Sequence, residues 1–190
     1  MTPRRRRQIP DELIAHLLSH TAALLWGARR PAEFRAQMFA SVPSLELRDA
    51  LSATFADADA LLLAGEEVLA AQLHEAAAAK ALLATHQLSL GDIAVLDTGR
   101  HFERDRQRRI RRIKIPACES SLPLDIDILV PEYFAERLER HLQVFRPHLP
   151  GAEESMNLFP AYSKTHLTVD ELRVRLSLLA LWSHATTTGA

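Results

Sequence analysis

Hydrophobic positions recur at helical spacing through the first part of the chain, which predicts that this part is helical. Proline suits a first helical turn, and glycine suits the residue after a helix end. The expected helices cover residues 10–27, residues 31–39, and a third stretch that begins at 43–44 and contains Leu47, Leu51 and Phe55.

Residues 59–86 are rich in alanine and leucine and hold one glycine, Gly65, and no proline. This composition favours one long helix or two abutting helices. We interpret the run Ala76–Ala79 as a surface for close packing between helices. Ser89–Ile93 then predicts a break followed by a restart of the helix.

The pattern changes after Gly99, where apolar and polar residues alternate. Ile113 and Ile115 alternate with basic residues, and Ile126 and Ile128 alternate with Asp125 and Asp127. A period of two is typical of half-buried strands. We therefore expect two antiparallel strands joined through residues 116–123.

Two more helices are expected after the strands. Glu132–Arg146 carries one apolar stripe and ends before Pro147, and Thr168 with Glu171 forms a capping box for the last helix. The predicted fold class is α+β and mainly helical, with helices around a small antiparallel hairpin. We expect a helical segment with a basic arm at 1–58 and a second part at 59–190.

Composition is that of an ordinary folded protein. Of 190 residues, 47% are hydrophobic and 25% are charged, and 23 Lys and Arg nearly balance 24 Asp and Glu. The single cysteine, Cys118, permits neither an intramolecular disulfide nor a cysteine-based zinc site, which fits a reducing compartment. No apolar run is long enough to span a bilayer. We expect a cytoplasmic protein with no membrane partner.

Positive charge is concentrated in two places. Arg4–Arg7 form a basic arm, and the stretch from Arg100 to Lys114 holds eight Lys and Arg against two acids. Arginines on a loop and strand can contact DNA phosphates without reading the sequence. The alternative is a solvated strand edge, where charge discourages edge pairing. The candidate DNA-binding residues are Arg100, Arg104, Arg106, Arg109, Arg111 and Lys114.

Several short motifs between Ala84 and Leu181 follow a familiar order. Ala84–Leu96 reads as the end of an alanine-rich helix, a turn and a short apolar helix, and it continues to Gly99–Phe102. A basic strand, Pro123–Ile126, an amphipathic helix and Asn157–Pro160 follow before the helix at Thr168. In this order the chain resembles an incomplete catalytic domain of the tyrosine recombinases, the phage integrase family, and the resemblance implies that residues 59–190 are this partial domain.

The resemblance implies a DNA-binding protein of recombination and integration. Such enzymes attack a DNA phosphate with a tyrosine; two arginines bind the phosphoryl oxygens, and a lysine in the hairpin turn protonates the leaving oxygen. Ser89 stands at the first arginine position, and Ser120 and Ser121 stand in a shortened lysine turn. The second arginine box and the nucleophile are expected beyond the Thr168 helix, past the last residue of the sequence. No catalytic residue is therefore predicted, and we expect no DNA cleavage by this chain alone.

Other candidate chemistry is weaker. His101–Arg104 spells the His-x-x-Arg box, but it precedes the strands and is interpreted as coincidence, and neither Tyr133 nor Tyr162 stands at the nucleophile's place. Lys114 on an arginine-rich strand is interpreted as solvated or facing DNA backbone. Only His16 and His20 share a helical face, so no metal or cofactor is expected.

Three functions remain open from the sequence. The first is an integrase-like protein that binds DNA weakly without cutting it. The second is a non-enzymatic protein whose helices bind a protein partner or a second copy of the chain. The third is a truncated gene product without a function.

Overall fold

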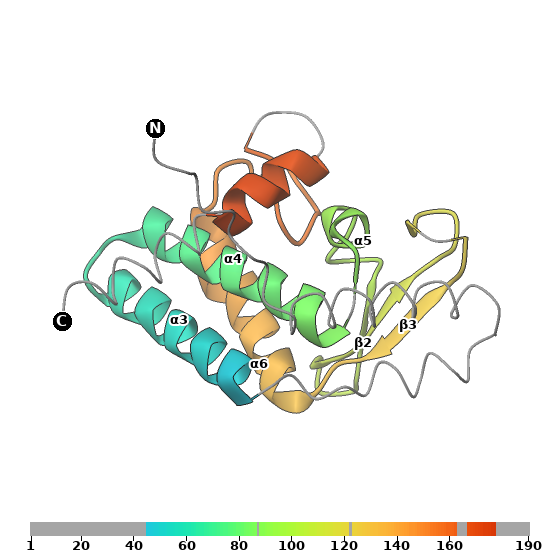
Figure 1. Cartoon of the computed structure of the whole chain (residues 1–190), viewed down its shortest axis with the longest axis horizontal. Coiled ribbons are helices and arrows are strands. Elements are labelled where there is room, and N and C mark those ends of the chain that lie inside the picture. Colours follow the sequence, from blue (N-terminus) through green and yellow to red (C-terminus); the bar gives the residue numbers. More distant parts are fainter. Residues whose placement is uncertain (1–44, 87, 122, 163–166, 178–190) are drawn as a thin grey trace, which may run out of the picture. The chain divides into compact units, whose positions relative to one another are not determined.

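The computed structural model describes residues 45–86, 88–121, 123–162 and 167–177 (Figure 1). All of these residues belong to one compact unit, Pro43–Ala190. The helices expected at 10–27 and 31–39, the basic arm Arg4–Arg7, and His16 and His20 lie outside the described residues. None of the described helices combines the length and apolarity needed to cross a membrane.

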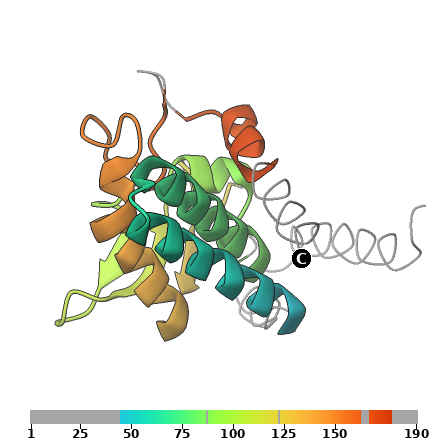
Figure 2. The ribbon, with the colours of Figure 1, turned by 90° about the vertical axis from the view of Figure 1, so that its left-hand side faces the viewer.

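Two long helices, α3 (Leu45–Leu63) and α4 (Glu67–His86), run side by side (Figures 1 and 2). The chain turns between them at Gly65, whose φ of +85° suits a residue without a Cβ. The third predicted helix and the start of the alanine-rich stretch are thus one helix, because the break falls at Gly65. The expected division between residues 58 and 59 lies inside α3.

The alanine run of α4 serves close packing, as predicted. Ala76, Ala77, Ala78 and Ala79 are each at most 2% exposed. Their small side chains let α3 approach the α4 backbone closely. The large core joins helices and sheet, and its largest fully buried residues include Leu82, Ile93, Ile113, Phe134, Leu138 and Phe159.

The sheet has three antiparallel strands in the order β1-β2-β3: β1 (Phe102–Arg104), β2 (Ile110–Ile115) and β3 (Ile126–Leu129). Ile113 of β2 faces Phe102 on one side and Ile128 on the other. The predicted hairpin is confirmed, together with a mixed fold of helices around a small antiparallel sheet. β1 was not predicted because three residues are too few for a visible period.

The helix expected at 132–146 is regular only in its first part. α6 covers Glu132–Arg140, a π-helical turn covers His141–Phe145, and a 3-10 turn covers Arg146–His148. Pro147 has no N–H to continue α-helical hydrogen bonding, and the chain leaves the helix around it. The short helix α5 (Leu90–Ala94) is the restart expected after Ser89.

Two buried histidines lie where α4 meets the π-helical turn. His74 and His141 are both 0% exposed, and their rings stack with centroids 5.3 Å apart. His74 also stacks on Phe145 at 4.1 Å. Burial lowers the pKa of His74 to about 2, with the charges of His141, Arg137 and Arg140 adding to the effect, and burial lowers the pKa of His141 to about 4. Both rings are therefore neutral parts of the core.

The neutral histidines make the fold sensitive to acid. The pKa of each histidine is near 6.5 in the unfolded chain and lower in the folded protein. Their contribution to the free energy of unfolding is therefore complete above about pH 6.5 and is lost as the pH falls toward the folded-state pKa values. The loss reaches about 1.4 kcal/mol per pH unit for each ring. We expect His74→Phe to gain about 1–1.5 kcal/mol of unfolding free energy relative to wild type between pH 7.5 and pH 5.5.

Urea denaturation at the two pH values measures this change. Burial raises the pKa of the neighbouring Glu75 to about 7, which acts in the opposite direction, but Glu75 is common to both proteins and cancels in the comparison. Phenylalanine keeps an aromatic ring against Phe145. A stability difference that is the same at both pH values would contradict the assignment.

The last described helix, residues 169–177, is joined to α4 by buried charges (red in Figure 1). Nη1 of Arg175 donates to Oε1 of Glu75 at 2.7 Å, and Nη2 donates to Glu171. The Tyr162 hydroxyl donates to the other Glu75 oxygen at 2.9 Å, and the Arg175 guanidinium lies 3.6 Å from the Tyr162 ring centroid. Tyr162 is therefore a packing residue. The amide of Glu171 donates to the hydroxyl of Thr168, as the predicted cap requires.

Candidate nucleic-acid interface

Ser89 and Asp92 form a capping box that begins α5. The Ser89 hydroxyl accepts from the Asp92 amide at 3.0 Å, and the Asp92 carboxylate accepts from the Ser89 amide at 2.9 Å. This exchange satisfies two N–H groups that a helix start leaves without partners. Serine is thus the residue that the local backbone needs at position 89.

The hairpin turn docks on this capping box. Asp92 accepts from the Ser121 amide at 2.7 Å, from the Ser121 hydroxyl at 3.0 Å and from the Ser120 hydroxyl at 3.3 Å. The Ser89 hydroxyl donates to the Ser121 hydroxyl at 2.8 Å. A chain of hydrogen bonds therefore runs from Ser89 through Ser121 to the carboxylate. We call these four residues, Ser89, Asp92, Ser120 and Ser121, the serine cluster.

The serine cluster carries negative charge. Asp92 is 2% exposed, and although burial raises the pKa of its carboxyl, hydrogen bonds from Ser121 and Ser89 outweigh burial and hold it below its ordinary value. An ionised carboxylate repels a phosphate, and the hydroxyls of Ser89, Ser120 and Ser121 already donate within the cluster. The cluster ties the hairpin to the helical part of the fold but offers a phosphate no cationic group.

Five of the six candidate DNA-binding residues are paired with acids. Most of these acids lie on other elements, so the fold brings opposite charges together that are far apart in sequence. An arginine held by a carboxylate has fewer N–H groups and less net charge to offer a phosphate. The pairs are Arg100 with Glu119 (3.1 Å), Arg104 with Glu139 (2.6 Å), Arg109 with Glu132 (3.2 Å), Arg111 with Asp105 (2.8 Å) and Lys114 with Glu103 (2.5 Å).

The exposed face of the sheet is an ion-pair ladder. Lys114 reaches Glu103 on β1, and Arg112 reaches Asp127 on β3 at 2.7 Å. Ile113 and Ile115 point to the opposite, buried face. Lys114 thus lies on the solvated face of β2, as interpreted from the sequence, and not inward toward the serine cluster.

The turn between β1 and β2 presents the remaining positive charge. Asp105 closes the turn by accepting from the amides of Gln107 and Arg109, each at 2.9 Å. Within the described part of the chain, no ion pair joins the side chain of Arg106 or Arg108. Arg108 has a φ of 63°, a conformation that glycine or asparagine adopts at lower cost. Arg108 was not among the six candidates, although Asp105, five positions before the first residue of β2, signals such a turn.

The chain matches no family model, no curated protein and no solved structure. The tyrosine recombinase resemblance therefore stays a prediction that rests on the motifs and on the contacts between the residues they specify. Ser89 contacts Ser121 directly, and Ser120 is linked to both through Asp92. The contacts leave the basic residues distributed over the sheet and its turn.

His101 and Arg104 do not form a joint site. His101 is 2% exposed; its Nδ1 accepts from the Asp97 amide at 3.0 Å, and its Nε2 lies 3.2 Å from a Glu119 oxygen. Arg104 pairs instead with Glu139 of α6. His101 thus accepts a hydrogen bond from the turn before β1 and lies next to the hairpin turn. Among the described residues, no three His, Cys, Asp or Glu side chains are placed to hold a metal ion.

Proposed function

We propose that this chain is a DNA-binding protein of the tyrosine recombinase type that does not cleave DNA. The observation that carries the proposal is the contact between Ser89 and Ser121, 32 positions apart in the sequence. The resemblance implies that the first catalytic arginine would stand at position 89 and that the lysine turn would include position 121. Two groups that act on the same phosphate must lie side by side, so this contact supports the motif assignment.

The residues at these positions cannot replace an arginine and a lysine. A serine hydroxyl has no charge and one donor, whereas a guanidinium offers a rigid fork of five N–H groups. Here the donors of Ser89 and Ser121 are committed within the serine cluster. The developing charge of a phosphoryl transition state would meet the Asp92 carboxylate instead of a cation.

DNA binding is assigned to the β1–β2 turn. Arg106 and Arg108 are exposed at the end of a hairpin, and Arg108 keeps a strained backbone although no ion pair within the described residues holds its side chain. Strain of this kind is often retained where a side chain has a function. Because the neighbouring basic residues are paired with acids, the binding is weak, independent of sequence and sensitive to salt.

A suicide duplex, nicked so that a covalent protein–DNA adduct would be trapped, tests the proposal. At low salt the duplex should be retarded on a native gel, and a denaturing gel should show no adduct. Ser89→Arg should give no adduct either, because the lysine turn is also altered and the substitution removes the cap of α5. A trapped adduct with the wild-type protein would overturn the claim that cleavage is lost.

A second candidate is a protein-interaction module in which the basic strand is incidental. The ion pairs of the candidate DNA-binding residues favour it, because they neutralise most of the positive surface within the described residues. Absence of any retardation of the duplex at low salt would support this candidate over DNA binding.

A further inference from the structure

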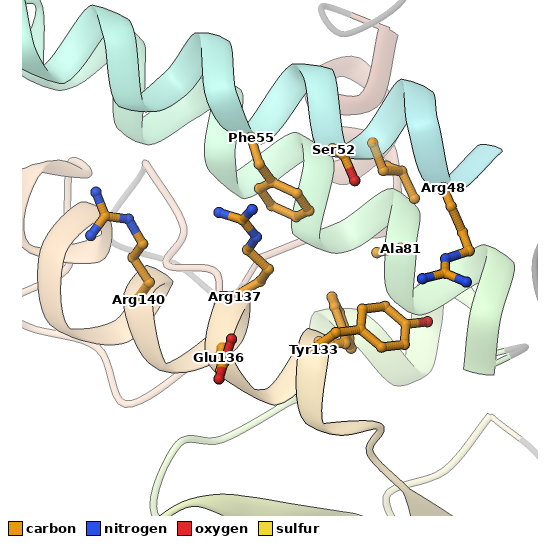
Figure 3. Close-up of a pocket in the computed structure, with 10 residues that line it drawn as sticks. Arg48, Ser52, Phe55, Ala81, Tyr133, Glu136, Arg137 and Arg140 are labelled. Carbon is orange, nitrogen blue, oxygen red and sulfur yellow. The ribbon is translucent and has the colours of Figure 1, made fainter. Parts of the chain in front are cut away.

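A cavity of about 400 Å³ opens between α3 and α6 (Figure 3), and its described lining includes no residue of the serine cluster or of the β1–β2 turn. Its floor is apolar: Leu51, Phe55, Ala81 and Phe134 are 7%, 4%, 2% and 2% exposed. Clefts of this size with an apolar floor and a few polar groups are typical of small-molecule sites. We call this cavity the α3–α6 cleft.

The rim of the cleft is cationic. Among the described residues that line it are three arginines, Arg48, Arg137 and Arg140, and one acid, Glu136. Arg140 is held by Asp59, to which it donates at 2.9 and 2.7 Å, whereas Arg137 lies 3.9 Å from that aspartate. Within the described residues, no carboxylate pairs with Arg48. Arg48 and Arg137 therefore keep donors that an anion could occupy.

The two arginines approach the cleft beside aromatic rings. The Arg48 guanidinium lies 5.1 Å from the centroid of the Tyr133 ring, and the Arg137 guanidinium lies 5.2 Å from that of Phe55. Figure 3 shows Arg48 and Ser52 entering from α3 and Tyr133 and Arg137 entering from α6. Tyr133 is 45% exposed although its ring is large and apolar. The apolar floor of the cleft is thus bordered by the accessible Tyr133 ring, by the hydroxyls of Tyr133 and Ser52, and by the guanidiniums of Arg48 and Arg137.

We propose that the α3–α6 cleft binds a small organic anion, with a phosphate or carboxylate held by Arg48, an apolar body on Leu51 and Phe55, and the positive charge of Arg137 farther along the cleft. Guanidinium groups bind both anions through paired, charge-assisted hydrogen bonds. The Tyr133 hydroxyl lies beside Arg48 and can donate to the same group (Figure 3). The inference goes beyond DNA binding, because no candidate DNA-binding residue lines the cleft.

Titration of the ¹⁵N-labelled full chain, followed by NMR, tests this inference. The probes are phenyl phosphate, benzoate, inorganic phosphate and benzyl alcohol. Phenyl phosphate or benzoate should give saturable shifts at Arg48, Ser52, Phe55 and Arg137, and the tighter of the two identifies the anion. Inorganic phosphate lacks the apolar body and benzyl alcohol lacks the charge, so each should bind at least about tenfold more weakly.

Substitutions localise the site. Arg48→Gln should weaken binding of the better probe by about tenfold or more, because it removes a charge-assisted hydrogen bond, and Arg137→Gln should weaken it less, because it removes only a nearby positive charge. Arg173→Gln, on the helix at 169–177 and paired with Asp170, should leave it unchanged. Shifts that map elsewhere, equal weakening by all three variants, or equal affinity for inorganic phosphate would overturn the inference. Duplex DNA that shifts the cleft residues when phenyl phosphate does not would also overturn it.

Discussion

Replacing Arg175 with methionine is expected to lower the free energy of unfolding by about 3–5 kcal/mol. Arg175 and Glu75 are 5% and 1% exposed, and each is the other's charge partner. Removing the guanidinium leaves a buried carboxylate whose remaining side-chain donor is the Tyr162 hydroxyl. Urea denaturation followed by circular dichroism measures the loss.

Two variants separate this cause from lost packing. Arg173→Met, at an exposed position of the same helix, should cost less than about 0.5 kcal/mol. The double variant Arg175→Met/Glu75→Gln should recover much of the stability, since no charge is left buried. The loss for Arg175→Met should also be smaller at pH 5.5 than at pH 8, because burial raises the pKa of Glu75 to about 7 even with the arginine present. A loss below about 1 kcal/mol would contradict a stabilising role for the pair.

Asp92→Ala is expected to cost about 3 kcal/mol, because it removes a buried acceptor that serves α5 and the hairpin turn together. The amides of Ser89 and Ser121 both donate to this carboxylate, at 2.9 and 2.7 Å. Without it, the turn loses the three hydrogen bonds that Ser120 and Ser121 donate to this carboxylate. Denaturation gives the total effect, and hydrogen exchange of the Ser121 amide gives the local one.

Matched variants give a graded series at this site. Asp92→Asn keeps the shape and one acceptor oxygen and should lose about half as much as Asp92→Ala. Ser89→Ala should cost about 1 kcal/mol, the usual effect of a lost helix cap. If the Ser121 amide exchanges at the wild-type rate in Asp92→Ala, the carboxylate does not hold the turn, and the serine cluster is only a surface arrangement.

The hairpin and the helix start at Ser89 were predictable because local patterns encode them. Ile113 and Ile115 alternate with charged neighbours, and Ser89 and Asp92 stand at capping-box spacing. β1 was not predictable, since it depends on pairing with β2. The irregular end of α6 was only partly predictable, because Pro147 marks where the helix must stop but not how its last turn widens.

The electrostatic character of the basic strand could not be read from the sequence. Its arginines form ion pairs with carboxylates of α6 and of the hairpin turn. One of these is Glu139, which pairs with Arg104 although the two are 35 positions apart in the sequence. A count of charges within the segment therefore overestimates its positive potential. The α3–α6 cleft escaped prediction for the same reason, because Arg48 and Tyr133 meet only when α3 and α6 pack.

The salt dependence of binding to a labelled duplex, measured by fluorescence anisotropy between about 50 and 200 mM salt, tests the proposed function most directly. Arg106→Gln/Arg108→Gln should flatten the slope of log K against log salt by about 2, since each phosphate contact contributes about 0.9. Arg112→Gln/Arg173→Gln removes two arginines that are already paired and should leave the slope unchanged. The account predicts weak binding with this difference between the two variants. No binding at the lowest salt, or the same slope for both variants, would contradict it.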